Sequence, residues 1–260
     1  MRRLLLAIPL LALAPPIAQA QEANNAAWLE RMPIGETLVY DAKFGILKLG
    51  KGMMRIAGID TVRGVESLHI IFHLQASSVF YRLDDRMDSW IGSSDFASRR
   101  FVQDFHEGAT DRYTVYDIYP DSGFYRQSGV DTVASTSPDP LDDVAFFYFV
   151  RTVKLEVGKT YEYNRYFRPD RNPVILEVLR KDTLDVPAGR FETLVIRLTI
   201  KGRGILGEAQ NPLMWLTDDD RRLMVQLKTT FASIATITLQ LREITDEVPE
   251  EMRRETDKPH

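Results

Sequence analysis

Residues 35–40, with the sequence GETLVY, return as GKTYEY at residues 158–163. Self-similarity at a fixed separation is the signature of an internal repeat. This match and three further ones in the same order predict that one β-rich unit is duplicated. Three further pairs follow at separations between 122 and 126 residues: ESLHI (66–70) with ETLVI (192–196), WIGSSD (90–95) with WLTDDD (215–220), and RRF (99–101) with RRL (221–223).

Hydrophobic and polar residues alternate along both copies. Residues 68–74, 194–200 and 237–241 each show apolar side chains at every second position. A period of two is typical of half-buried β-strands. Short turns, such as residues 63–64 and 187–189, connect the strands and favour antiparallel pairing. The predicted fold class is therefore all-β and mainly antiparallel, with two duplicated curved sheets or half-barrels.

The segment 138–153 breaks the strand pattern and separates the first β repeat (33–137) from the second (154–244). Asp139 is suited to cap a helix and Pro140 to occupy its first turn. The run that follows is rich in aromatic residues, which nearly encircle the predicted helix. A helix that is apolar all round is buried, so we expect it to connect the two sheets and to pack against them.

The two ends of the chain have distinct compositions. Residues 1–20 combine a basic start, an apolar run and a small-x-small ending, which predicts a secretory signal peptide cleaved after Ala20. The apolar run is shorter than the ~20 residues of a spanning helix and contains prolines, which argues against a retained anchor. We therefore expect a periplasmic protein without a stable membrane anchor. Residues 21–32 form a short lead-in, and the charged segment 245–260 is expected to be disordered.

Composition excludes several classes of function. The formal net charge is −4 and no cysteine is present. An acidic chain offers no basic field for nucleic acid. Without cysteine, an exported protein has no disulfides, no thiolate metal ligands and no thiol nucleophile.

Motifs for catalysis are also missing, so we expect no enzyme activity, no cofactor and no metal. The sequence contains no Gly-x-Ser-x-Gly elbow, no His-Glu-x-x-His helix and no phosphate-binding glycine loop. His69 and His73 lie four residues apart on one predicted strand, about 13 Å apart and too far to share a metal. The acidic runs 84–88 and 218–220 are interpreted as strand and turn residues. A pair of distant carboxylates acting as a hydrolase remains an open alternative.

Five motifs together resemble the bacterial family of unknown function numbered 3108, over about residues 33–244. That resemblance implies an exported, mostly β protein and no catalytic residues. The Trp-bearing strand with its Asp turn and Arg-bearing strand is also similar, in architecture, to the half-barrels of periplasmic lipoprotein carriers. The motifs are GETLVY (35–40), DSWI (88–91), the DPL helix start (139–141) with its aromatic run ending at Arg151, VPAGRF (186–191), and WLTDD (215–219) followed by two arginines.

The leading hypothesis is a non-catalytic binding, carrier or chaperone-like protein for an apolar or amphipathic envelope ligand, such as a lipid, an acyl chain or a lipoprotein. Trp90 and Trp215 occupy equivalent positions in the two repeats and are candidate ligand contacts, together with Phe146, Phe147 and Phe149 of the predicted helix. The alternatives are an envelope assembly factor that binds a protein or polysaccharide partner and a carboxylate-based hydrolase.

Overall fold

The computed structural model describes residues 28–29, 31–77, 82–200, 209–231 and 235–254, and these form one fourteen-stranded antiparallel sheet with one α-helix. The all-β, mainly antiparallel prediction is confirmed. The first half contains β1 (Thr37–Phe44), β2 (Leu47–Val62), β3 (Val65–Ser77), β4 (Arg82–Gly92), β5 (Ser98–Glu107), β6 (Thr110–Tyr119), β7 (Phe124–Gln127) and β8 (Ala134–Ser135). Helix α2 (Asp143–Phe149) is followed by β9 (Thr160–Tyr163), β10 (Val174–Val186), β11 (Gly189–Thr199), β12 (Ala209–Thr217), β13 (Met224–Phe231) and β14 (Ala235–Thr245).

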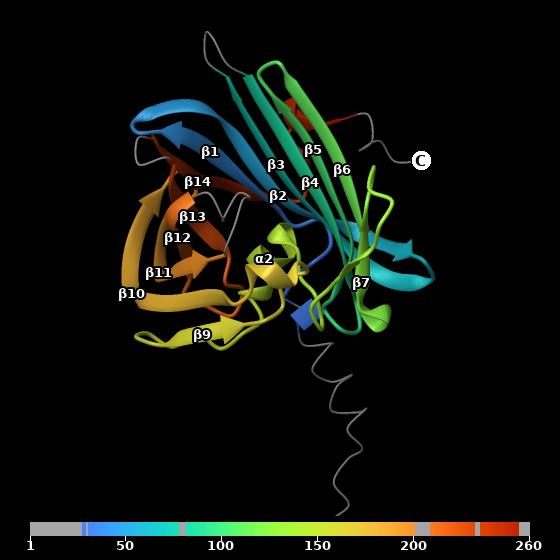
Figure 1. Cartoon of the computed structure of the whole chain (residues 1–260). Coiled ribbons are helices and arrows are strands. Elements are labelled where there is room, and N and C mark those ends of the chain that lie inside the picture. Colours follow the sequence, from blue (N-terminus) through green and yellow to red (C-terminus); the bar gives the residue numbers. More distant parts are fainter. Residues whose placement is uncertain (1–27, 30, 78–81, 201–208, 232–234, 255–260) are drawn as a thin grey trace, which may run out of the picture.

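The two halves join into a continuous sheet rather than forming separate ones. The strand order runs from β8 back to β1, crosses to β14, and then runs back to β9. The junction extends from the pair Thr37 and Thr245 to the pair Phe44 and Ile237. An unpaired edge leaves a row of backbone groups without partners, so pairing β1 with β14 satisfies both inner edges. Figure 1 shows that the resulting sheet curves around α2.

The repeated segments occupy equivalent strands in the two halves. Trp90 on β4 donates a hydrogen bond from Nε1 to Asp60 on β2, at 3.0 Å. Trp215 on β12 donates in the same way to Asp182 on β10, at 3.2 Å. Each aspartate also accepts a hydrogen bond from the backbone N–H of the threonine that follows it. Such equivalent contacts are expected if one unit was duplicated. Duplication itself remains a prediction from the sequence.

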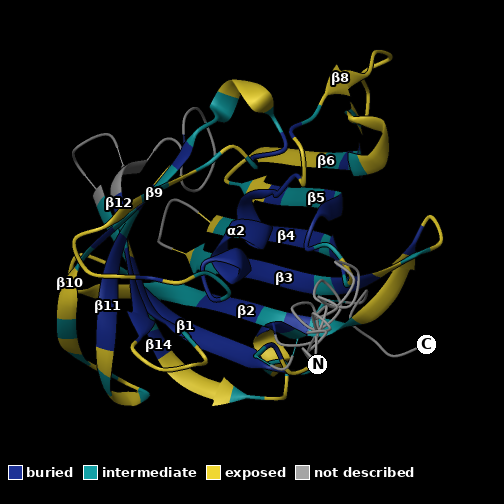
Figure 2. Cartoon of the chain, turned by 90° about the horizontal axis from the view of Figure 1, so that it is seen from below, coloured by how far each residue is buried: buried dark blue, intermediate teal, exposed yellow. Residues whose placement is uncertain are grey.

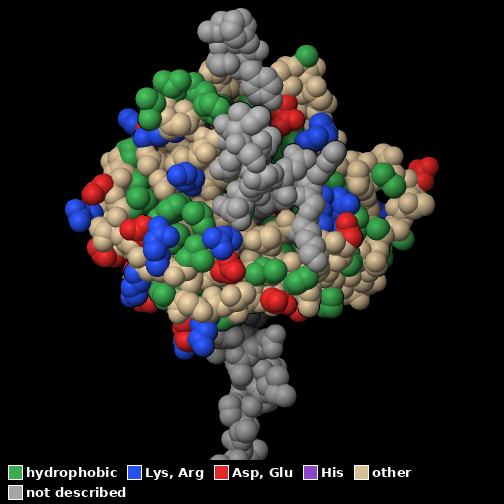
Figure 3. Space-filling view, turned by 60° about the vertical axis from the view of Figure 1, so that its left-hand side comes forward, with side chains coloured by type: hydrophobic (Ala, Val, Ile, Leu, Met, Phe, Trp, Pro, Cys, Tyr) green, Lys and Arg blue, Asp and Glu red, His purple; other side chains and the backbone are tan. Residues whose placement is uncertain are grey.

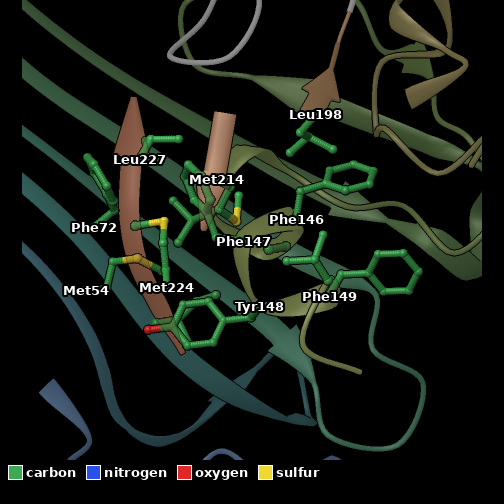
Figure 4. Close-up of a cluster of buried hydrophobic side chains, with 14 of the residues drawn as sticks. Met54, Phe72, Phe146, Phe147, Tyr148, Phe149, Leu198, Met214, Met224 and Leu227 are labelled. Carbon is green, nitrogen blue, oxygen red and sulfur yellow. The ribbon is translucent and has the colours of Figure 1, made fainter. Parts of the chain in front are cut away.

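Helix α2 fills the concave side of the sheet. All seven of its residues are buried, and Figure 2 shows that buried residues concentrate on α2 and on the strands that face it. Phe147 stacks on Phe72 of β3 with ring centroids 5.7 Å apart. Figure 4 shows the α2 side chains among residues from both halves, including Met54 of β2 and Met214 of β12. The helix therefore forms the core that both halves share.

The predicted start and length of this helix are wrong in detail. Asp142, not Asp139, is the N-cap, and its carboxylate accepts hydrogen bonds from the backbone N–H groups of Val144 and Ala145. The second carboxylate oxygen of Asp142 accepts from the hydroxyls of Ser89 and Ser98 on the sheet. Because the sheet supplies these two donors, it selects the later aspartate as the cap. The helix then ends at Phe149 instead of continuing to residue 153.

The chain segments that flank the sheet are also ordered by contacts with it. Trp28, in the lead-in, packs edge-on against Phe96 with ring centroids 4.7 Å apart. The predicted disorder of 245–260 is wrong for the described part, because Met252 is fully buried in a small outer cluster with Met53 and Ile71. The predicted signal peptide (1–20) and its predicted cleavage site lie outside the described residues. Among the described residues, no helix is long and apolar enough to cross a membrane.

Candidate functional site

The candidate aromatic residues of α2 belong to the core. Phe146, Phe147 and Phe149 expose 0%, 1% and 7% of their surface. Phe146 also meets Tyr166 with ring centroids 6.2 Å apart, and Phe149 meets Tyr163 at 4.9 Å. A ligand could reach these rings only if α2 moved away from the sheet, so the structure places them as packing residues. Their role in ligand binding remains a prediction.

The two candidate tryptophans do not line a common pocket with the phenylalanines of α2. On β4, Ser89 and Ile91 point toward the core, so Trp90 points to the opposite, outer face of the sheet. There it stacks on His69 with ring centroids 4.3 Å apart and an interplanar angle of 5°. Trp215 is buried, with 6% of its surface exposed. Both tryptophans are anchored by their aspartates, and neither lines the apolar cavity described next.

An apolar cavity of about 240 Å³ lies on the concave face near the turn between β1 and β2. Ala42 and Ala76 contribute small side chains to its wall, which leaves space that larger residues would fill. The cavity is lined by Ala42, Lys43, Phe44, Leu49, Leu74, Ala76, Ser77, Leu83 and Ile237.

The turn beside this cavity carries exposed apolar side chains, and we call residues 44–47 the hairpin tip. Phe44, Ile46 and Leu47 expose 44%, 95% and 60% of their surface. Turns normally carry polar residues, so an apolar run around Gly45 is the sequence signal that could have identified this site. The hairpin tip belongs to none of the repeated segments or family motifs found in the sequence. In Figure 1 the hairpin tip lies where β1 and β2 end, on the rim of the curved sheet and away from α2.

Two lysines near the hairpin tip are held by hydrogen-bonding partners. Lys48 lies 2.6 Å from Asp41, and Lys43 donates to Gln240 at 2.6 Å. On the face presented in Figure 3, basic and acidic side chains are interspersed and form no extended field of one sign. The surroundings of the cavity are therefore suited to an apolar group more than to a polyanion.

The acidic run 84–88 divides between the two faces of the sheet. Burial alone would raise the pKa of Asp84, but hydrogen bonds from Arg254 and His73 outweigh it and hold that pKa at about 2. Burial acts in the same way on Asp88, where hydrogen bonds from His69 and Arg86 bring the pKa to about 2. Both carboxylates are thus committed to ion pairs. No group of three His, Asp or Glu residues in the described ranges is placed to hold a metal.

Asp85 lies between these two residues and points to the concave face. Its neighbour across the strand pair is Phe105 on β5, and its Oδ1 atom is buried without a hydrogen-bond partner in the described part of the chain. Burial, followed by the nearby Glu107, raises the pKa of Asp85 to about 7. An inward carboxylate with a raised pKa is a functional-site candidate on physical grounds. The sequence pattern of residues 84–88 does not distinguish Asp85 from the neighbouring Asp84 and Asp88.

Comparison with solved structures shows the same fold in a β-barrel-like protein of the domain of unknown function DUF1849 from Brucella abortus. The TM-score is 0.51 at 7% identity, over 81% of this chain and 96% of that chain. A candidate exported protein with a YmcC-like fold from Bacteroides fragilis aligns at a TM-score of 0.38 and 10% identity, over 82% and 97% of the two chains. A candidate lipoprotein from Parabacteroides distasonis aligns at 0.35 and 9%, over 83% and 98%.

Among curated proteins, none matches this chain. The family model described as "Protein of unknown function (DUF3108)" matches residues 39–242. That range begins in β1 and ends in β14, so it contains the whole sheet apart from the ends of those two strands, together with α2. The chain therefore belongs to the DUF3108 family, as the five motifs quoted from its sequence predicted.

Proposed function

We propose that this chain is a non-catalytic binding protein of the cell envelope, which holds the apolar part of an amphipathic ligand in the apolar cavity. The ligand class is a lipid, an acyl chain or the lipid part of a lipoprotein. The observation that carries the proposal is the position of the cavity directly beside the exposed hairpin tip, since Phe44 belongs to both. The export pattern of residues 1–20 supports a location in the periplasm.

The size of the cavity limits what it can hold. Pockets for drug-sized ligands usually span roughly 300 to 1,000 Å³, and this cavity has about 240 Å³. It suits one end of an acyl chain rather than a whole lipid. Each methylene group that leaves water contributes about 0.8 kcal/mol, so six of them would supply about 5 kcal/mol before the entropic cost of binding.

The hairpin tip supplies the route by which such a ligand would enter. Ile46 and Leu47 are exposed where a soluble protein normally shows polar residues. Contact of these side chains with a lipid surface would remove their area from water, which is favourable. The cavity would then open next to the lipid from which the chain is taken.

The test begins with native mass spectrometry and lipid extraction on mature protein purified from the periplasm of its own host. We expect a bound lipid or acyl chain at one copy per protein. The variant Ala76→Leu fills the cavity and should reduce the bound fraction at least several-fold, while Ala134→Leu on the exposed strand β8 should not change it. Thermal melts of both variants establish that each is folded. A ligand-free wild type, or equal lipid in A76L and wild type, would refute the proposal.

A further inference from the structure

A second cavity, of about 230 Å³, lies on the same concave face but shares no lining residue with the apolar cavity. Its floor is built from three cross-strand pairs of β5 and β6, in which Phe101 faces Tyr116, Gln103 faces Thr114, and Phe105 faces Arg112. Residues two apart on a strand point to the same face. The register of this strand pair therefore aims all six side chains into one space.

The roof of this cavity is the segment 166–171, which is fastened to the chain just before α2. Tyr166 forms a parallel bridge with Leu141, and the backbone N–H of Phe167 donates to the Leu141 carbonyl at 2.9 Å. Asn172 accepts from the Tyr166 backbone N–H at 2.9 Å. These bonds hold the roof in place, so the cavity is preformed.

Three arginines line the cavity, against one buried aspartate, and we name it the arginine cavity. Arg171 donates to the hydroxyl of Tyr166 at 3.0 Å, and that hydroxyl lies 3.2 Å from the Asp143 carboxylate. Arg168 lies 3.7 Å from the exposed Asp170, and its buried Nε atom has no hydrogen-bond partner among the described residues. Among the described lining residues, three arginines therefore share a single carboxylate, that of Asp143.

Arg112 completes the set from the floor. Arg112 is exposed, and its guanidinium lies over the ring of Phe105, 4.9 Å from the centroid. Its charge also acts on the nearby Asp85, where it opposes the rise in pKa that burial causes. Guanidinium groups recognise carboxylates and phosphates with paired hydrogen bonds. The aromatic walls interlock, with Tyr116 and Phe167 at 5.1 Å and Phe101 and Phe167 at 6.3 Å between centroids.

We propose that the arginine cavity binds a small organic anion that carries a flat apolar group, of the aromatic carboxylate or aryl phosphate class. The anionic end lies between Arg112 and Arg168, and the flat group lies along the aromatic walls. Gln103, Thr114 and Gln127 are polar groups that can orient the ligand. This site is separate from the apolar cavity and does not depend on the envelope-lipid function.

The test is isothermal titration calorimetry of the mature protein with phenyl phosphate, inorganic phosphate and benzyl alcohol. We expect one phenyl phosphate per protein, bound at least roughly tenfold more tightly than either other probe, because each of those supplies only half of the recognition. Tight binding of inorganic phosphate equal to that of phenyl phosphate would overturn the proposal, since the aromatic walls would then play no part. Absence of phenyl phosphate binding at millimolar concentration would overturn it as well.

Two variants test the arginines independently. Arg112→Gln and Arg168→Gln should each weaken phenyl phosphate binding by roughly tenfold or more, as expected for a lost charged hydrogen bond. Arg190→Gln on β11 is the matched control, because Arg190 is 71% exposed and distant from the lining residues. Thermal melts show whether each variant is folded. Equal affinity in R112Q, R168Q and wild type would contradict the assignment.

Discussion

Replacing Asp85 by asparagine should stabilise the protein at alkaline pH and leave it nearly unchanged at acidic pH. The Asp85 side chain points to the concave face, its residue exposes only 8% of its surface, and its Oδ1 has no partner among the described residues. Burial is the main cause that raises its pKa to about 7, and Glu107 raises it further, while Arg112 acts in the opposite direction. Asparagine keeps the shape of the side chain and removes the charge.

The sign and size of the effect follow from the two pKa values. An unfolded aspartate has a pKa near 3.9, and the folded value is about 7. Because the folded pKa is the higher one, the stability contributed by protonated Asp85 is fully present below about pH 4 and is lost as the pH rises to about 7. About three pKa units correspond to about 4 kcal/mol. We reduce this to about 2 kcal/mol because water reaches part of the surrounding surface.

The assay is urea unfolding of wild type and D85N, followed by tryptophan fluorescence at several values between pH 4 and pH 8. The free energy of unfolding of D85N should exceed that of wild type by about 2 kcal/mol at pH 8, and the two should converge near pH 4. Parallel curves over the whole range would refute this reasoning.

Asp84→Asn is the matched control, one residue away and on the other face of the sheet. The pKa of Asp84 is held at about 2 by Arg254 and His73, against the effect of burial. Since its folded pKa is the lower one, its contribution is present above about pH 4 and is lost as the pH falls toward 2. D84N should therefore lose about 1 kcal/mol at pH 7, after allowance for solvent screening. Opposite signs for the two neighbours would establish which face each occupies.

Three further predictions follow from single contacts. Arg151→Met should lower the free energy of unfolding by about 3 kcal/mol in urea titrations, because the buried carboxylate of Glu36 loses its buried partner and keeps only the half-exposed Arg221, at 2.7 Å. Ile46→Ser should reduce cosedimentation with phospholipid vesicles while the melting temperature stays constant, since this side chain is 95% exposed. Gly50→Ala should lower the melting temperature, with a cost of about 1 to 3 kcal/mol, because its new Cβ would meet the Gln75 backbone at 1.9 Å.

Strand positions could be predicted from sequence because the alternation records which side chains face the core. Leu194, Ile196 and Leu198 lie on one strand and are all buried in the core, as their spacing requires. The pairing of β1 with β14 could not be predicted in this way. Alternation fixes the face of a strand but not its neighbour, and the two strands are far apart in the chain. The sequence therefore predicts two curved sheets or half-barrels and leaves open whether they join into one.

The candidate site was harder to predict, because aromatic residues serve both cores and ligand sites. A phenylalanine such as Phe147 suits a core and a ligand site equally well. Its contact with Phe72 in the structure assigns it to the core. The cavities depend instead on small residues and on side chains from distant segments. Ala76 and Arg168 belong to no recognisable motif. Ala76 lines its cavity because the sheet curves, and Arg168 lines the other because the segment 166–171 covers β5 and β6.

The location of both cavities follows from a mismatch in length between the helix and the strands it covers. Helix α2 has 7 residues and is about 10 Å long, whereas β2 has 16 residues and extends for about 50 Å. So short a helix covers only part of the concave face. The apolar cavity forms on strands of the first half and on β14, and no α2 residue lines it. The arginine cavity forms against the first turn of α2, at Asp143. The short helix therefore leaves parts of the concave face uncovered, and both cavities lie in those parts.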